Sequence, residues 1–224
     1  VVKFLIVRVR PEKHIDFDPG TSLLRLVEEY QELQEQYFSA TGGEDALPRR
    51  IFELSQTSET PRRYPAVPFA HLPVVLQAAQ GDLSRATEIL RRTGYSLDQP
   101  ALAEMEHWLR LTANWLERHA PEQSRFEVLE APPQVTLSSA QKAFLFRLAS
   151  HLAEVAWEAD QVHNAVYAVL QEQGLATRQA FSACYLALLG KPQGPRLGYL
   201  LSSLPREFVV NRFHEVAQSA QDTK

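Results

Sequence analysis

An early segment of the chain alternates apolar and polar side chains with the period of an α-helix. Apolar residues recur three and four positions apart from Leu23 to Tyr37, and glutamates occupy many of the positions between them. This spacing puts the apolar side chains on one helix face and the acids on the opposite face. Asp18 can cap the start, and Gly42-Gly43 is typical of a helix end. The pattern predicts an amphipathic helix over residues 23–38.

Two short runs on either side of this helix have the period of two that is typical of a strand. Residues 14–18 read His-Ile-Asp-Phe-Asp, and residues 50–54 alternate less cleanly. They are the only strand candidates in the chain, and they could pair across the helix between them.

A polar segment over residues 55–67 follows, and it is interrupted by Pro61 and Pro65. Such a composition is typical of a connector between domains. We therefore expect a small module over residues 1–60, with two short β-strands, and a second domain over residues 65–224.

Nearly every segment beyond the connector shows helical periodicity or helix-capping residues. Asp98 and Ser138 precede long repeats as N-cap residues, and Asp82 or Ser84 caps a shorter one. No internal repeat of fixed period occurs. The chain is therefore predicted to be mainly α, and its second domain to be an α-helical bundle or cage, with helices over 68–80, 84–94, 98–116, 138–157, 160–173, 177–189, 195–202 and 205–217.

The composition, with 45% hydrophobic and 22% charged residues, is that of an ordinary globular chain. The single cysteine, Cys184, excludes an internal disulfide and gives no sign of an oxidising compartment. No apolar run reaches about 18 residues, which excludes an ordinary transmembrane helix. The chain begins at Val1 without a signal-peptide pattern. We expect a cytoplasmic protein, and we interpret Val1 as the cut end of a longer one.

The net charge of −4 hides an asymmetry along the chain. Residues 1–45 carry nine acidic and five basic side chains, whereas residues 174–214 carry five basic side chains and one acid, Glu207. A polyanion would be attracted to the second segment and repelled by the first. Chance variation on a solvated surface explains the same numbers equally well.

The sequence lacks the residue patterns of most catalytic sites. The closest histidine pairs are twelve residues apart, and a single cysteine cannot form a zinc finger or a redox motif. Neither a dinucleotide fingerprint, a P-loop nor a Gly-x-Ser-x-Gly elbow occurs. The acid pairs, such as Glu104 and Glu106, are more typical of a solvated helix face than of a catalytic dyad. We expect no catalytic or metal-binding residues in this chain, which is then a binding or structural module.

Three stretches, taken in order, carry a resemblance to a known family. They contain RVRPEK and IDFD at residues 8–13 and 15–18, VPFAHL at residues 67–72, and GKPQGPRLG at residues 190–198. Together they resemble the C-terminal half of the class I lysyl-tRNA synthetases, which are built on a Rossmann catalytic core. In that family the first stretch follows the catalytic KMSKS loop, and the glycine-rich turn lies near the C-terminus.

The resemblance implies a tRNA-binding part of an enzyme rather than an active site. Signatures of the HIGH and KMSKS type are absent, so this chain alone would lack the catalytic machinery and hold no cofactor. ATP and Mg²⁺ would bind in the missing catalytic domain of the parent enzyme. Residues 1–60 would contact the inner arm of the tRNA, and residues 65–224 would hold the anticodon loop. The expected partner is tRNA-Lys, bound by a monomer, with no DNA or membrane partner.

An anticodon loop offers phosphates and unstacked bases, so its partner needs cations and aromatic rings. The turn at residues 190–198 combines close-packing glycines with two cations, and a tyrosine follows it. The alternative interpretation is a helix corner in which Arg196 pairs with a helix end or a carboxylate. An arginine pair on the connector could contact the tRNA stem or be a solvated hinge. The candidate tRNA-binding residues are Lys191, Arg196, Tyr199, Arg62, Arg63 and Arg178.

Two other functions stay open on the sequence. The helical domain could be a protein-interaction scaffold without an RNA role, recognisable by an exposed apolar patch. It could also be the equivalent cage of a glutamyl-type class I synthetase. The three tryptophans lie on apolar helix stripes, so we expect them in the core rather than on a base-stacking surface.

Overall fold

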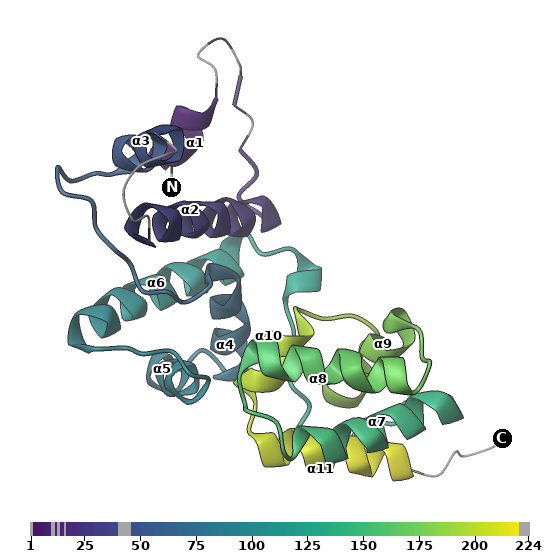
Figure 1. Ribbon diagram of the computed structural model, residues 1–224. Helices are drawn as coiled ribbons and strands as arrows, with labels where there is room; N and C mark the ends of the chain where they lie inside the picture. Colours follow the sequence, from purple (N-terminus) through teal and green to yellow (C-terminus); the bar gives the residue numbers. More distant parts are fainter. Residues whose placement is uncertain (1, 10–11, 13, 16, 40–45, 220–224) are drawn as a thin grey trace. The chain divides into compact units, whose positions relative to one another are not determined.

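The computed structural model describes residues 2–9, 12, 14–15, 17–39 and 46–219, and every regular element in those ranges is helical (Figure 1). None of the described helices is long and apolar enough to cross a membrane. Two of the elements are short 3₁₀ helices, η1 and η2. In chain order the elements are α1 (Val2–Arg8), α2 (Thr21–Ser39), α3 (Ala46–Ser55), η1 (Phe69–His71), α4 (Leu72–Ala78), α5 (Leu83–Arg92), α6 (Gln99–Arg118), η2 (Glu122–Ser124), α7 (Ser139–Leu152), α8 (Ala159–Glu172), α9 (Thr177–Leu189), α10 (Leu197–Ser203) and α11 (Arg206–Gln218).

The expectation of two short strands is wrong for the described residues. Residues 50–54 lie inside α3. Phe52 is fully buried, whereas Arg49 Nε and Glu53 Oε1 form an ion pair of 3.4 Å on the outer surface of the helix. A spacing of four between ion-pair partners belongs to a helix. The described residues of the other candidate, 14–18, have no regular structure, and Asp16 lies outside them. Helix α1 was not predicted at all.

Local capping chemistry fixes several helix starts where the sequence predicted them. Asp82 rather than Ser84 caps α5, and its carboxylate accepts from the backbone N–H of Arg85 at 3.0 Å. Asp98 caps α6 in the same way. Ser138 forms a complete capping box with Gln141 at the start of α7. Because each cap satisfies an otherwise unpaired backbone N–H, it fixes the residue at which its helix begins.

Other predicted boundaries shift or fall outside the structure. The helix expected over 68–80 is the 3₁₀ turn η1 followed by α4, and α7 ends at Leu152 rather than near residue 157. Gly42-Gly43, the predicted end of α2, lies outside the described residues, as do Arg10, Pro11 and Lys13 of the first sequence motif.

The chain divides into two compact units. Unit 1 contains Val1–Pro73 and Leu97–Pro121, and unit 2 contains Val74–Ser96 and Glu122–Lys224. In unit 1, α3 packs against both α1 and α2. Phe4, Tyr30 and Phe52 form its aromatic core, with ring centroids of neighbouring pairs 5.5 and 5.6 Å apart. Trp115 of α6 is buried in this unit and donates from Nε1 to the carbonyl oxygen of Pro19 at 2.7 Å.

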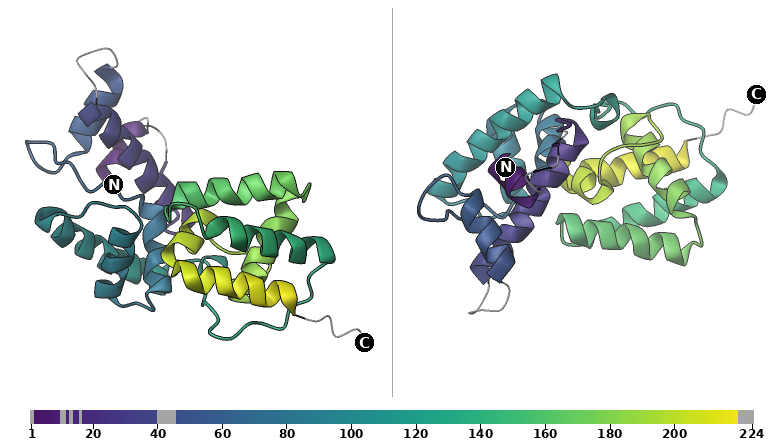
Figure 2. Two further views of the ribbon diagram at one scale, coloured as in Figure 1. Left: turned by 60° about the horizontal axis from the view of Figure 1, so that its bottom comes forward. Right: turned by 90° about the horizontal axis from the view of Figure 1, so that it is seen from above.

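Unit 2 is a bundle of helices around one continuous apolar core. Helix α7 packs along α11 and also contacts α8 and α9, while α10 lies against α8 (Figures 1 and 2). Phe144 and Leu148 of α7, and Phe213 of α11, are fully buried between them. Trp157 is also buried, as predicted, and it donates to the carbonyl oxygen of Leu204 at 2.9 Å. The bundle gives α8, α9 and α10 fixed positions relative to one another, and these three helices carry the candidate site.

Candidate nucleic-acid interface

The turn between α9 and α10 is anchored by its glycines. Gly190 ends α9 with a φ of 66°, in the left-handed region that favours glycine. A Cβ placed on Gly194 would lie 2.7 Å from the ring of Tyr185, so glycine lets the turn pack directly on that ring. The hydroxyl of Tyr185 also donates a hydrogen bond to the carbonyl oxygen of Pro195. These contacts hold the turn while the side chain of Lys191 stays exposed to solvent.

A third glycine brings α10 against α8. A Cβ on Gly198 would lie 2.5 Å from the carbonyl oxygen of Ala159 and 3.0 Å from Cβ of His163. Any larger residue would therefore push the two helices apart. This close approach places the first turn of α10 beside the first turns of α8. At the start of α10, the Arg196 guanidinium lies 5.7 Å from the centre of the Tyr199 ring.

Half-buried aromatic rings also lie on α8 and α9, beginning at His163, where α8 meets α10. The ring centroids of His163 and Tyr167, one turn apart on α8, are 4.8 Å from each other. Phe181 of α9 lies 5.7 Å from Tyr167 and 6.4 Å from His163, both at steep angles. These rings, together with Tyr199 and Tyr95, are called the aromatic strip below.

The aromatic strip includes Tyr95, whose hydroxyl is neutral. Burial raises the pKa of Tyr95, and the nearby Tyr199 and Asp160 raise it further. Their influence requires the three side chains to lie near one another. The phenol therefore keeps its proton at neutral pH, where it can donate a hydrogen bond, while a carboxylate can accept one.

Exposed cations flank the aromatic strip, although fewer than the sequence suggested. Arg178 lies in the first turn of α9, three residues before Phe181, and is exposed, as are Lys191 and Arg196. The two remaining cations of residues 174–214 have structural roles. Arg206 donates to the carbonyl oxygens of Ala153 and Val155, after the end of α7, at 2.9 and 2.6 Å.

Arg212 is buried and donates to three carbonyl oxygens of the bundle. The surface available to an anion in this part of unit 2 is therefore concentrated at the turn and at the start of α9.

Four of the six predicted site residues lie in unit 2, and the other two lie in unit 1. Arg178, Lys191, Arg196 and Tyr199 belong to unit 2, whereas Arg62 and Arg63 belong to unit 1. Arg63 donates to Glu35 at 2.9 Å and lies 5.7 Å from the centre of the Phe38 ring. The Arg62 side chain is exposed.

Sequence reasoning missed Tyr95, His163, Tyr167 and Phe181. The i, i+4 spacing of His163 and Tyr167 puts them on one helix face, but that pattern is equally typical of a core stripe. Only the packing of α8 against α9 and α10 shows that these rings lie half-buried on a common surface.

No cluster of three or more potential metal ligands occurs among the described side chains.

Two segments of the chain match known protein families. A model described as an anticodon binding domain matches residues 121–217, and one described as class I (K) tRNA synthetases matches residues 1–58. The lysine–tRNA ligase of Archaeoglobus fulgidus is 40% identical over 214 residues, which are 95% of this chain and 40% of that protein. The corresponding enzyme of Thermoplasma volcanium is 34% identical over 218 residues, 96% of this chain and 42% of that protein. The chain belongs to the class I lysyl-tRNA synthetases, as part of their C-terminal region.

The matches locate the candidate interface within the synthetase sequence. The anticodon-binding match contains Arg178, Lys191, Arg196 and Tyr199, together with every ring of the aromatic strip except Tyr95. Arg62 and Arg63 lie in neither match. The chain spans about two fifths of the length of the lysine–tRNA ligases it matches.

Proposed function

We propose that this chain is the tRNA-binding, anticodon-recognising part of a class I lysine–tRNA ligase and that its partner is tRNA-Lys. The observation that carries the proposal is the aromatic strip, which lies beside exposed cations inside the segment that matches an anticodon binding domain. The surface combines ring faces for unstacked bases with positive charge for the phosphates between them.

In this proposal each kind of side chain has its own task. Arg178, Lys191 and Arg196 attract phosphates and orient the loop without reading its sequence. The rings of Tyr167 and Tyr199 stack on bases that leave the anticodon stack, and such stacking is worth about 1–3 kcal/mol per base. Reading of base edges falls to polar groups beside the rings, such as the Asp160 carboxylate near Tyr95.

The rest of the chain would support the same task. We propose that residues 1–60 contact the inner arm of the tRNA, that residues 65–224 hold the anticodon loop, and that Arg62 contacts the stem from the connector between them. Arg63 is the weaker candidate, because Glu35 already neutralises it. The support for this division is the synthetase match over residues 1–58 and the anticodon-binding match over residues 121–217.

Lysylation itself would take place outside this chain. Signatures of the HIGH and KMSKS type are absent from its sequence, so ATP and Mg²⁺ are assigned to the catalytic domain of the parent enzyme. We propose that the chain supports catalysis by placing the tRNA, as a monomer in the cytoplasm.

The proposal is tested by fluorescence anisotropy with a labelled tRNA-Lys transcript at low and at physiological salt, beside a transcript with a swapped anticodon. We expect binding that weakens as salt rises and decreases with the swap. The substitutions Lys191→Ala and Arg196→Ala should each lower affinity severalfold and reduce the salt dependence. Arg85→Ala, an exposed arginine on α5, is the matched control and should change neither. Absence of binding to both transcripts would contradict the proposal and favour a protein-interaction scaffold.

A further inference from the structure

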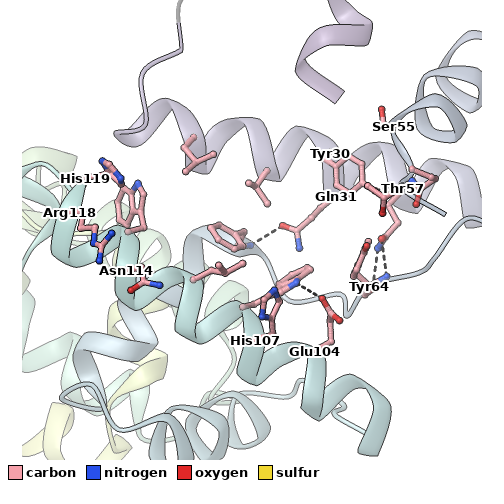
Figure 3. Close-up of a pocket in the computed structure, with 18 residues that line it drawn as sticks. Tyr30, Gln31, Ser55, Thr57, Tyr64, Glu104, His107, Asn114, Arg118 and His119 are labelled. Atoms are coloured by element: carbon pink, nitrogen blue, oxygen red, sulfur yellow. Dashed lines mark hydrogen bonds between the residues drawn. The ribbon is translucent and has the colours of Figure 1, made fainter. Parts of the chain in front are cut away.

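Unit 1 contains a pocket that the proposed tRNA-binding role does not use. It has a volume of about 540 Å³ and lies between α2 and α6, with the connector after α3 along one side (Figure 3). The polar residues labelled in Figure 3 lie around a largely apolar interior, to which both helices contribute side chains on one face.

One end of the pocket is lined by aromatic rings. The ring centroid of Trp108 on α6 lies 5.7 Å from that of Tyr64 and 5.9 Å from that of Phe69, at interplanar angles of 38° and 63°. Two of these rings are half-buried, and all three line the pocket. Ring faces carry partial negative charge, so aromatic rings that line a pocket attract an organic cation.

Two glutamines of α2 hold the backbone of Tyr64 and Phe69 in place. The Gln34 side chain accepts from the backbone N–H of Tyr64 at 2.9 Å and donates to its carbonyl oxygen at 3.1 Å. Gln31, one turn earlier, accepts from the N–H of Phe69 at 2.9 Å and donates to the carbonyl oxygen of Val67 at 2.7 Å. The connector is thus fixed to α2 at two points, and the aromatic end of the pocket is preformed.

A carboxylate lies at the same end. Oε1 of Glu104 accepts a hydrogen bond from Nε1 of Trp108 at 2.9 Å, which holds the half-buried carboxylate beside the indole ring. Within the described part of the chain, no basic side chain forms an ion pair with Glu104. The negative charge is therefore available to a ligand, and it disfavours an RNA phosphate at this position.

Apolar side chains line a further part of the pocket, and polar residues, among them His107 and Asn114, lie around them. Leu23 and Val27 of α2 line this part, together with Leu111 of α6, which is 48% exposed. Arg118 and His119 lie near the opposite end of α6. A ligand with one positive charge would therefore place its head at the Glu104 end and its apolar part along the leucines.

We infer that this pocket binds an alkylammonium ion, with the ammonium head beside Glu104 and against the rings of Trp108 and Tyr64 and the alkyl chain along Leu111. The rings and the carboxylate favour a positively charged head group, and the apolar side chains of the pocket favour an alkyl chain on the ligand. A free amine and the lysine side chain of another protein share this chemistry.

Isothermal titration calorimetry on the full chain tests the inference with hexyltrimethylammonium, tetramethylammonium and 1-hexanol. Hexyltrimethylammonium should bind most tightly, because it alone has both the charge and the chain. N-acetyl-lysine amide, compared with hexylamine, distinguishes a protein lysine from a free amine. Equal affinity for 1-hexanol and hexyltrimethylammonium, or no binding of any cation, would overturn the inference.

The substitution Glu104→Gln removes the charge and keeps an oxygen that accepts from Trp108. It should weaken hexyltrimethylammonium about tenfold and leave 1-hexanol unchanged. Glu106→Gln is the matched control, since Glu106 pairs with Arg110 at 3.6 Å and does not line the pocket. An equal effect of both substitutions would also contradict the inference. The assay contains no RNA, so its outcome is independent of the proposed anticodon-binding function.

Discussion

Arg212 is only 3% exposed, and its guanidinium reaches three backbone carbonyl oxygens from α11. It donates to Leu129 and Glu130 at 2.9 and 2.6 Å and to Ala187, near the end of α9, at 3.3 Å. Burial lowers the pKa of Arg212, and the carboxylate of Glu215 partly opposes that shift. The residue thus connects the segment before α7 to two helices of the bundle, although it is one of the five basic side chains counted over residues 174–214.

Replacement of Arg212 by methionine should destabilise the fold. The variant keeps much of the apolar stem but leaves three carbonyl oxygens without their donor, a loss of about 3 kcal/mol. The midpoint of urea unfolding, followed by circular dichroism, measures the change. Arg178→Met, at an exposed position, should shift that midpoint little. Similar midpoints for both variants would mean that Arg212 does not hold the segment.

Cys184 is fully buried on α9, and burial raises the pKa of its thiol. We expect no reaction with a thiol reagent at about pH 8 in the folded protein and a full reaction after unfolding in urea. Because the unfolded thiol loses its proton first as pH rises, this group should also reduce stability above about pH 8.5. Rapid labelling of the native protein would contradict the position of α9 in the core.

At the scale of elements, the start of α7 depends on a local motif. Ser138 accepts from the N–H of Gln141 at 3.2 Å, and the Gln141 side chain accepts from the N–H of Ser138 at 3.0 Å. Because α7 packs against α8, α9 and α11, fraying at its start should weaken the whole bundle.

The substitution Ser138→Ala should cost about 1 kcal/mol, the typical value of an N-cap. Thermal unfolding followed at 222 nm measures it, and the neighbouring Ser139→Ala serves as the control because that exposed serine is already inside the helix. A larger loss for Ser139→Ala than for Ser138→Ala would show that α7 begins elsewhere.

The sequence predicted elements well where periodicity and caps agreed, as in α2, α6 and α7. The sequence-based prediction failed for α3, because the five residues around Phe52 fit an alternating strand pattern as well as a helical one. The burial of Phe52 in a core with Phe4 and Tyr30 favours the helix. The sequence also predicted the turn at residues 190–198 from its glycines. It could not predict that Tyr167 of α8 meets Phe181 of α9, since that contact arises from tertiary packing.

At the scale of the whole molecule, the two units carry different chemistry. Unit 1 contains the pocket with Glu104 and the whole of the acidic helix α2, whereas unit 2 contains the aromatic strip and the exposed cations of the turn. The sequence predicted two domains that are each one continuous stretch of the chain, over residues 1–60 and 65–224. Residues 97–121 nevertheless belong to unit 1, because contacts such as that of Trp115 with Pro19 join them to it.

The central claim is that the aromatic strip binds unstacked bases of the anticodon loop. The most direct measurement is the affinity of the Tyr167→Leu variant for a labelled anticodon stem-loop of tRNA-Lys, compared with wild type and with Tyr37→Leu, whose half-buried ring lies in unit 1. Leucine retains apolar volume but has no ring face. We predict about tenfold weaker binding for Tyr167→Leu, unchanged binding for Tyr37→Leu, and the same salt dependence for all three. Wild-type affinity in the Tyr167→Leu variant would contradict the claim.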